Sequence, residues 1–223
     1  MIPPPRHAEP DPALEVIYRG RGYVAINKPS GVLSVPGKNP AVPNCVEVCR
    51  RMFPDATGPM VIHRLDMETS GILLMALDED SQRELSMQFE ARMVDKKYVA
   101  LLHGLVDADA GRVSLPIRPD IERRPIQIVD HVHGKPSTTM FRVLSREVDR
   151  TRVEFEPITG RTHQLRVHAA MPRAEGGMGH PIIGDVLYSP PPHAGRLMLH
   201  ASFLAFMDPG TGRRVELESR PEF

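Results

Sequence analysis

The chain has 223 residues, which suits one large domain or two small domains that share a sheet. Apolar residues make up 41% of it, as in an ordinary protein with a packed core, and 28 basic residues balance 28 acidic ones. A formal net charge of zero argues against a uniformly basic nucleic-acid binder, although a neutral total can hide a basic face. The sequence contains no apolar run of the ~18 residues that a membrane span needs, so we expect none.

The N-terminal segment MIPPPRHAEPDP has neither the basic nor the apolar region of a signal peptide. Its prolines lack amide donors and favour extended backbone, so we expect a flexible arm over 1–14 and the folded domain over 15–223. The two cysteines, Cys45 and Cys49, lie four positions apart. We interpret them as buried thiols of a cytoplasmic protein, because a disulfide framework needs more cysteines and a secreted context.

Taken in chain order, hydrophobic spacing and turn residues predict these elements for the first half: two short strands around a glycine turn in 14–29, a helix over 44–53 capped by Asn44, a loop into a buried strand in 61–78, and a helix over 78–94. The same signals predict these for the second half: a strand over 96–106, a short strand over 111–117, a hairpin over 137–160, a helix over 162–171, a loop over 179–188 and a hairpin over 196–220. Strands outnumber helices, and most are joined as hairpins. We therefore predict an α+β fold with a mostly antiparallel, mixed central sheet and flanking helices and loops.

The stretch VIHRLDMETSGILLMALD, residues 61–78, places an acid and two basic side chains at the mouth of a buried strand. Asp66 precedes a Thr-Ser-Gly turn, so a purely structural Asx-type turn explains it. The functional alternative is a carboxylate that acts as a nucleophile or base, with Arg64 nearby to favour its charged form. The residues alone leave both interpretations open.

The stretch PITGRTHQLRVHAAM, residues 157–171, gathers further polar side chains at the start of a predicted helix. Thr162 can cap that helix. Arg161, His163 and Arg166 supply hydrogen-bond donors, but a polar amphipathic helix explains them equally well.

Ten histidines are scattered along the chain, and none forms an H-E-x-x-H pattern or a Cys/His cluster with ligand spacing, so we expect no metal. Phosphate-binding loops, dinucleotide fingerprints and nucleophile elbows are absent from the sequence as well. These absences favour an enzyme without a cofactor that acts on an anionic polymer, and they do not identify the reaction.

Six segments resemble, in the same order, the RluA family of pseudouridine synthases: NKPSGVLSVPG, HRLDMETSGILLMAL, KKYVALLHG, PITGRTHQLRVH, GHPIIGD and RLMLHA. The resemblance extends from about residue 15 to the C-terminus. It implies the pseudouridine synthase catalytic fold, without the S4-type RNA-binding domain of many members. It also implies cofactor-free isomerisation of a uridine in structured RNA, in 23S rRNA, in the tRNA anticodon stem-loop or in both.

The resemblance further implies a role for each of five residues. Asp66 matches the catalytic aspartate, which is the nucleophile or, in a competing account, the group that helps remove the ribose 2′ proton. Tyr98, otherwise an ordinary strand aromatic, matches the tyrosine that stacks on the target base and takes the C5 proton. Arg166 matches the arginine that pairs with the aspartate. Arg64 matches the arginine that displaces the target nucleotide, and Leu199 matches the apolar residue under the base.

The expected partner is RNA, with no membrane and no metal, and we expect a monomer. Two segments depart from the family pattern. The link over 171–179 is long, and its Gly-Gly pair suggests a flexible excursion, while the residues before GKPSTT differ and affect the choice of RNA if they contact it. Two alternatives from other classes are an RNA-binding module or RNA chaperone without catalysis, and a glycoside hydrolase, which needs a second catalytic acid.

Overall fold

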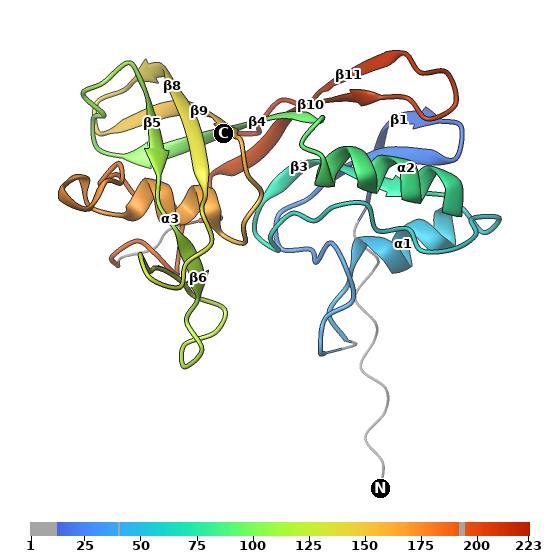
Figure 1. Ribbon diagram of the computed structural model, residues 1–223, viewed down its shortest axis with the longest axis horizontal. Helices are drawn as coiled ribbons and strands as arrows, with labels where there is room; N and C mark the ends of the chain where they lie inside the picture. The colour runs from blue at the N-terminus through green and yellow to red at the C-terminus, as the bar shows by residue number, and fades with distance from the viewer. Residues whose placement is uncertain (1–12, 40, 192–194) are drawn as a thin grey trace, which may run out of the picture.

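The computed structural model describes residues 13–39, 41–191 and 195–223. A nine-stranded mixed sheet runs through both halves of the protein in the order β1-β2-β3-β10-β4-β9-β8-β5, with β11 beside β10 (Figure 1). Its strands are β1 (Glu15–Gly20), β2 (Tyr23–Lys28), β3 (Ser70–Ala76), β4 (Asp95–His103), β5 (Ala110–Ser114), β8 (Thr138–Arg146), β9 (Arg150–Pro157), β10 (Leu199–Met207) and β11 (Arg214–Glu218). The helices are α1 (Cys45–Met52), α2 (Glu79–Glu90) and α3 (Gln164–Ala170), with a 3-10 turn η1 (Arg173–Glu175). Strands β6 (Ile117–Pro119) and β7 (Gln127–Val129) form a separate pair.

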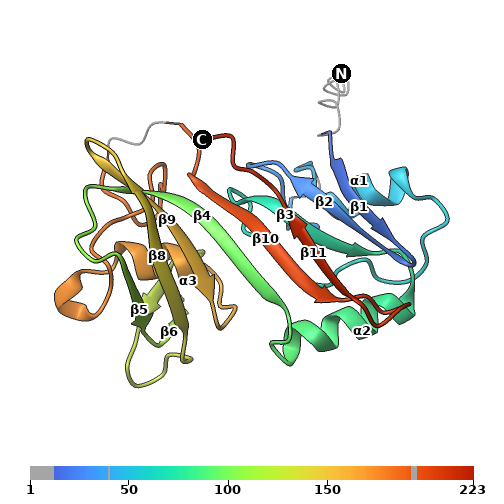
Figure 2. The same ribbon diagram turned by 90° about the horizontal axis from the view of Figure 1, so that it is seen from above.

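The sheet joins two lobes. Figure 2 shows β10 and β4 side by side through its middle, with β1 to β3 on one side and β5, β8 and β9 on the other. Helices α1 and α2 belong to the first lobe, and α3 belongs to the second. All strand pairs in the described chain are antiparallel except β3 with β10, which is parallel. The predicted α+β fold with a mostly antiparallel, mixed sheet is confirmed.

The parallel pair explains the Thr-Ser-Gly turn of the sequence. Gly71 has φ 110° and lies opposite Ala201 of β10. A Cβ at position 71 would collide with the carbonyl oxygen of Ala201, so only glycine permits this approach. The turn thereby fixes the loop before β3 against the centre of the sheet.

Most element ends follow local sequence signals, and one helix start does not. The Asn44 side chain accepts a hydrogen bond from the Glu47 amide at 3.0 Å and caps α1, as predicted. Helix α3, in contrast, begins at Gln164 after His163, whose φ is 54°. The prediction that Thr162 caps this helix was therefore wrong. The side-chain oxygen of Gln164 accepts from the Arg161 amide at 3.0 Å instead.

The two segments that depart from the family pattern are both ordered parts of the second lobe. In the 171–179 link, Met178 is 5% exposed and packs in the core beside α3. The Met178 amide donates to the carbonyl of His168, and none of the link's described residues lines the cleft considered below. The expected flexible excursion is instead a folded turn. In the other segment, Gln127–Val129 form β7, a strand that we did not predict.

Of the expected N-terminal arm, residues 1–12 lie outside the described residues, and Leu14 is 8% exposed in the core of the first lobe. No helix in the described ranges is long and apolar enough to cross a membrane.

Candidate active site

An open cleft of about 920 Å³ lies where the two lobes meet. It has walls from the loop over 61–69 in the first lobe and from the segment over 157–166 in the second, with β4 and β10 between them. All five expected site residues line it: Arg64, Asp66, Tyr98, Arg166 and Leu199. Residues more than a hundred positions apart in the sequence are thus brought into one hollow. Its volume is of the size that holds a small organic ligand.

The backbone around Asp66 is held in place by a buried lysine. Lys28, at the end of β2, is fully buried, and its Nζ donates to the carbonyls of Pro29 at 2.9 Å, Val32 at 2.6 Å and Met67 at 2.8 Å. Burial lowers the pKa of Lys28 to about 8. Three acceptors match the three donors of an ammonium group, so Lys28 ties the Asp66 loop to the loop after β2.

The remaining carbonyls of the Asp66 loop are also bonded. The Ser34 hydroxyl donates to the Leu65 carbonyl at 2.7 Å and accepts from the Leu65 amide at 3.0 Å. The Thr69 amide donates to the Asp66 carbonyl at 3.1 Å, and the Ser30 hydroxyl donates to the Glu68 carbonyl at 2.7 Å. The backbone that carries Asp66 is therefore fixed at every residue from 65 to 68.

The carboxylate of Asp66 contrasts with this backbone. It is 26% exposed and accepts no hydrogen bond from the residues that the structure describes. Two donors face its Oδ2 from the second lobe: Arg166 Nη1 at 3.8 Å and His163 Nε2 at 3.9 Å. Both distances exceed those of a hydrogen bond, so the oxygen atoms remain accessible from the cleft.

Arg166 is held mainly by another acid. Its side chain, 4% exposed on α3, makes a bidentate pair with fully buried Asp185, through Nε at 2.8 Å and Nη2 at 2.6 Å. Burial by itself would lower the pKa of Arg166, but hydrogen bonds and charge from Asp185 outweigh it and raise the pKa. The resemblance led us to expect Arg166 paired with Asp66. The structure gives that pair only a loose contact and places the tight pair on Asp185.

A tyrosine orients the histidine that faces Asp66. The Tyr188 hydroxyl accepts from the Gln127 amide at 2.7 Å and lies 2.7 Å from His163 Nδ1. Because the hydroxyl already accepts this bond, we assign its proton to the bond with Nδ1, which is then the acceptor. Burial lowers the pKa of His163, so the neutral ring carries its proton on Nε2, the atom directed at Asp66.

Tyr98 and Leu199 form the floor of the cleft on the two central strands. Leu199 is 3% exposed and packs in the core of the second lobe. Tyr98 is half-buried between the cores of both lobes. Burial, followed by the negative charge of Asp66, raises the pKa of Tyr98, so its phenol is neutral in the unliganded protein.

The two neighbours of Asp66 with basic side chains differ. His63 stacks on Phe89 with ring centroids 4.3 Å apart, and its Nε2 accepts from the Leu74 amide at 3.0 Å. Burial lowers the pKa of His63 to about 3, so it is a neutral structural residue. Arg64 is exposed at the cleft and has no ion pair within the described part of the chain. It is free to reach a ligand.

Sequence reasoning missed three supporting residues: Lys28, Asp185 and Tyr188. Lys28 and Asp185 lie in segments that carry the family resemblance, NKPSG and GHPIIGD, and the buried contacts of both are long-range. No local pattern marks Tyr188. The described residues contain no group of three or more His, Cys, Asp or Glu that could hold a metal ion.

Comparison with known proteins identifies the family of the chain. Residues 22–171 match the family model described as RNA pseudouridylate synthase. The dual-specificity RNA pseudouridine synthase RluA of Pasteurella multocida is 42% identical over 217 residues, which cover 96% of this chain and 95% of that protein. The protein of the same name from Yersinia pestis is 41% identical over 212 residues, covering 93% and 99%.

Solved structures agree. Human RNA pseudouridylate synthase domain containing 1 superimposes with a TM-score of 0.78 and 31% identity, over 96% of this chain and 87% of that one. Human RNA pseudouridylate synthase domain containing 4 has a TM-score of 0.75 and 26% identity, over 93% and 88%. The chain therefore belongs to the RluA family of RNA pseudouridine synthases, the enzymes that isomerise uridine to pseudouridine in RNA.

Proposed function

We propose that this enzyme modifies a uridine in a stem-loop of 23S rRNA, of the tRNA anticodon arm or of both, and that Asp66 is its catalytic carboxylate. The observation that carries the proposal is the Asp66 side chain, which has a fixed backbone and no hydrogen bond among the described residues in an open cleft. Relatives named dual-specificity RNA pseudouridine synthases, 40 to 42% identical to this chain, support action on more than one RNA, and the choice of these two RNAs rests on the family resemblance.

The uridine has to leave its stack before the reaction. Flipping a nucleotide out of a folded RNA costs a few kcal/mol, which inserted and stacking side chains can offset. Arg64 is exposed and has no ion pair in the described chain, so it can enter the RNA in place of the target. Tyr98 and Leu199 then offer an aromatic and an apolar surface to the flipped base.

The chemistry exchanges one bond to the ribose for another. The N1–C1′ bond breaks, the uracil turns, a C5–C1′ bond forms, C5 loses its proton and N1 gains one. No atoms or electrons are left over, so the reaction requires no cofactor. Asp66 attacks C1′ or assists removal of the 2′ proton, and its free oxygen atoms suit either role. Arg166 and the Nε2 proton of His163 face Oδ2, so they orient the carboxylate and stabilise its charge.

Tyr98 enters this reaction as a neutral phenol. Its pKa is raised, so it cannot be the base while Asp66 is charged and no substrate is bound. As a neutral phenol it can take the C5 proton of the intermediate, in which C5 bears both a hydrogen and the ribose, only if it passes its own hydroxyl proton to water or to the uracil in the same step. The rate should therefore lack the tenfold rise per pH unit that a requirement for free phenolate imposes.

We assign the catalytic domain to residues 15–223 and infer a monomeric, cytoplasmic enzyme. One alternative, an RNA-binding module or chaperone without catalysis, gains no support from the comparisons. The glycoside hydrolase alternative requires a second catalytic acid. Asp185 is fully buried in its pair with Arg166, and although Glu90 also lines the cleft, the relatives found are pseudouridine synthases.

The test is tritium release from RNA that carries 5-³H-uridine. Total rRNA and total tRNA, extracted from cells that lack this gene, are offered separately to the purified enzyme, and the modified position in the active pool is then mapped. Release from either pool supports the proposal and names the substrate class. If the enzyme binds both pools and releases tritium from neither, the proposed substrates are wrong.

A further inference from the structure

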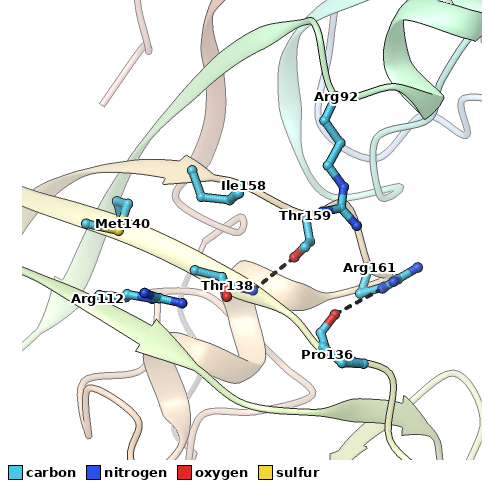
Figure 3. A pocket seen from close by; sticks show the side chains of 8 residues that line it. All are labelled: Arg92, Arg112, Pro136, Thr138, Met140, Ile158, Thr159 and Arg161. Atoms are coloured by element: carbon cyan, nitrogen blue, oxygen red, sulfur yellow. Dashed lines mark hydrogen bonds between the residues drawn. The ribbon is translucent and has the colours of Figure 1, made fainter.

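A second hollow of about 420 Å³ opens beside the Asp66 cleft (Figure 3). It lies over β8 and the end of β9, and four of its lining residues also line the cleft: Arg92, Ile158, Thr159 and Arg161. The two hollows therefore form one continuous depression. Thr138 and Thr159 are linked by a hydrogen bond from the Thr138 amide at 3.0 Å, which fixes the hollow's base.

Three arginines from separate elements surround this hollow. Arg92 follows α2 and reaches in from the first lobe, Arg112 lies on β5, and Arg161 follows β9 (Figure 3). The Nε atom of Arg112 donates to the Ser114 hydroxyl at 2.9 Å, and that of Arg161 donates to the Pro136 carbonyl at 3.4 Å. None of the three forms an ion pair with a described acid, and no acid lines the hollow.

Two exposed arginines of β8, in contrast, are paired. Arg142 lies 3.0 Å from Glu154, and Arg146 lies 2.8 Å from Asp109. Three arginines without an ion pair to a described acid thus line a single hollow, which is the pattern of an anion-binding surface. The acid nearest to this row of residues across the strands is Glu156 of β9, which lies opposite Met140. Its negative charge acts to raise the pKa of Lys96, a residue of the cleft.

Two apolar side chains line the hollow beside Thr138 and Thr159. Met140 on β8 is 39% exposed, and Ile158, directly after β9, is 42% exposed, so both can contact a ligand. Met140 stands directly opposite Arg112, so a cation and an apolar surface lie side by side on one face. A nucleotide presents the complementary pair of surfaces, a charged phosphate and a flat base or sugar.

We propose that this hollow binds a nucleotide of the substrate RNA next to the flipped uridine, with its phosphate among Arg92, Arg112 and Arg161 and its base or ribose on Met140 and Ile158. The inference deepens the proposed function and rests on it for the identity of the strand. It adds a binding subsite on the β5-β8-β9 face that the five site residues do not include.

The test measures binding of a tRNA anticodon stem-loop at several salt concentrations. Arg112→Gln removes one charge from a residue that lines this hollow and not the Asp66 cleft. We expect affinity to fall roughly 3- to 10-fold at low salt and the salt slope to lose about one unit. Met140→Ser should weaken binding without changing the slope, and Glu156→Gln should strengthen it.

Arg142→Gln is the matched control, because Arg142 is exposed on the same lobe but already paired with Glu154. It should bind and turn over like the wild type. A second series uses RNAs with a single neutral methylphosphonate near the target. At one position of the RNA, the methylphosphonate should weaken binding by the wild type but cause no further loss of affinity in Arg112→Gln.

Binding is read directly, so the hollow is tested whether or not tritium is released. An unchanged affinity and salt slope for Arg112→Gln would overturn the subsite, even with a fully active wild type. A wild type that binds with the expected arginine dependence and releases no tritium would overturn the proposed substrate and leave the subsite standing.

Discussion

The two walls of the cleft hold their charged groups in opposite ways. In the first lobe, Lys28 and two serines fix the backbone of the Asp66 loop, while the Asp66 carboxylate has no hydrogen bond among the described residues. In the second lobe, the charged group itself is fixed, because Arg166 is buried in a bidentate pair with Asp185. One wall thus presents a rigidly placed but chemically free acid, and the other presents a cation that cannot move toward it.

Because of this difference, the second lobe can orient the Asp66 carboxylate without pairing with it. A bidentate Arg166–Asp66 pair would occupy both carboxylate oxygens and reduce their nucleophilicity. With Asp185 as the competing partner, Arg166 stays at 3.8 Å and His163 at 3.9 Å. Both donors face Oδ2 without reaching hydrogen-bond distance. Asp185 is therefore the residue that keeps Asp66 available, and substitution there is the strongest way to break the contrast between the walls.

Removal of the Asp185 charge should have the largest effect on stability. Asp185→Ala leaves a buried arginine unpaired, so we expect the free energy of unfolding to fall by about 3–5 kcal/mol. The midpoint of urea denaturation measures this. Asp80→Ala, which breaks an exposed pair with Arg83, is the control and should cost less than about 1 kcal/mol. Equal losses for the two variants would contradict the assignment of Asp185.

Acid should lower the stability of both lobes, because a buried histidine lies behind each wall of the cleft. His168 lies on α3, and His200 bonds Ser70 beside the Asp66 loop at 2.9 Å. Burial lowers the pKa of each from 6.5 to about 4. The unfolded chain therefore binds more protons between these values, and stability is lost as the pH falls from 6.5 toward 4. For fully buried His168 the loss is about 3 kcal/mol by pH 4.

Denaturation at pH 7 and at pH 4 tests this. His168→Asn should be less stable than the wild type at pH 7 and should lose less further stability on acidification. His131→Gln, on an exposed turn, should follow the wild type at both values. A wild type that is equally stable at pH 7 and pH 4 would contradict the assignment of His168 and His200 as buried, neutral histidines.

The Tyr188 hydroxyl holds His163 in the second wall of the cleft. Its loss should reduce stability less than the Asp185 substitution does. Tyr188→Phe leaves the Gln127 amide without its acceptor and His163 Nδ1 without its donor. We expect a loss of about 1–2 kcal/mol in stability. Turnover should fall roughly 10-fold, because the ring no longer keeps its Nε2 proton toward Asp66.

Nitrogen NMR of the His163 ring shows whether the loss of turnover comes from a change in its tautomer. The variant should show a mixture of tautomers, whereas the wild type should show the proton on Nε2 alone. Tyr18→Phe, on β1 away from the cleft, is the control for loss of a phenol. A wild-type proton on Nδ1 would contradict the hydrogen-bond assignment.

The smallest effect on the free protein is expected for Arg64. Its side chain is exposed and unpaired within the described chain, so Arg64→Ala should change stability by no more than about 0.5 kcal/mol. Its KM for stem-loop RNA should rise, and the defect should shrink on a single-stranded substrate, from which no nucleotide has to be displaced. An equal defect on both RNAs would count against the flipping role.

The sequence predicts those parts of this architecture that local patterns encode. Alternating apolar residues gave both hairpins, and Asn44 marked the start of α1. The Asp66 segment was locally ambiguous and became a site only through a resemblance along the chain. What could not be predicted depends on distant contacts: Arg166 meets Asp185 across 19 positions and Lys28 meets Met67 across 39. The left-handed backbone at His163 takes the place of the expected Thr162 cap, and the His163 ring bonds to Tyr188, 25 positions away.

The proposed mechanism depends on one carboxylate, that of Asp66, which accepts no hydrogen bond from the described residues. The most direct test is tritium release from 5-³H-uridine RNA by the wild type and Asp66→Asn, with RNA affinity and urea denaturation measured on both. Asn is nearly isosteric, so fold and binding should be retained, while release should fall by roughly 10⁴-fold or more, as for other residues that act as a unit with their partners. Release by folded Asp66→Asn at a rate near that of the wild type would contradict the claim.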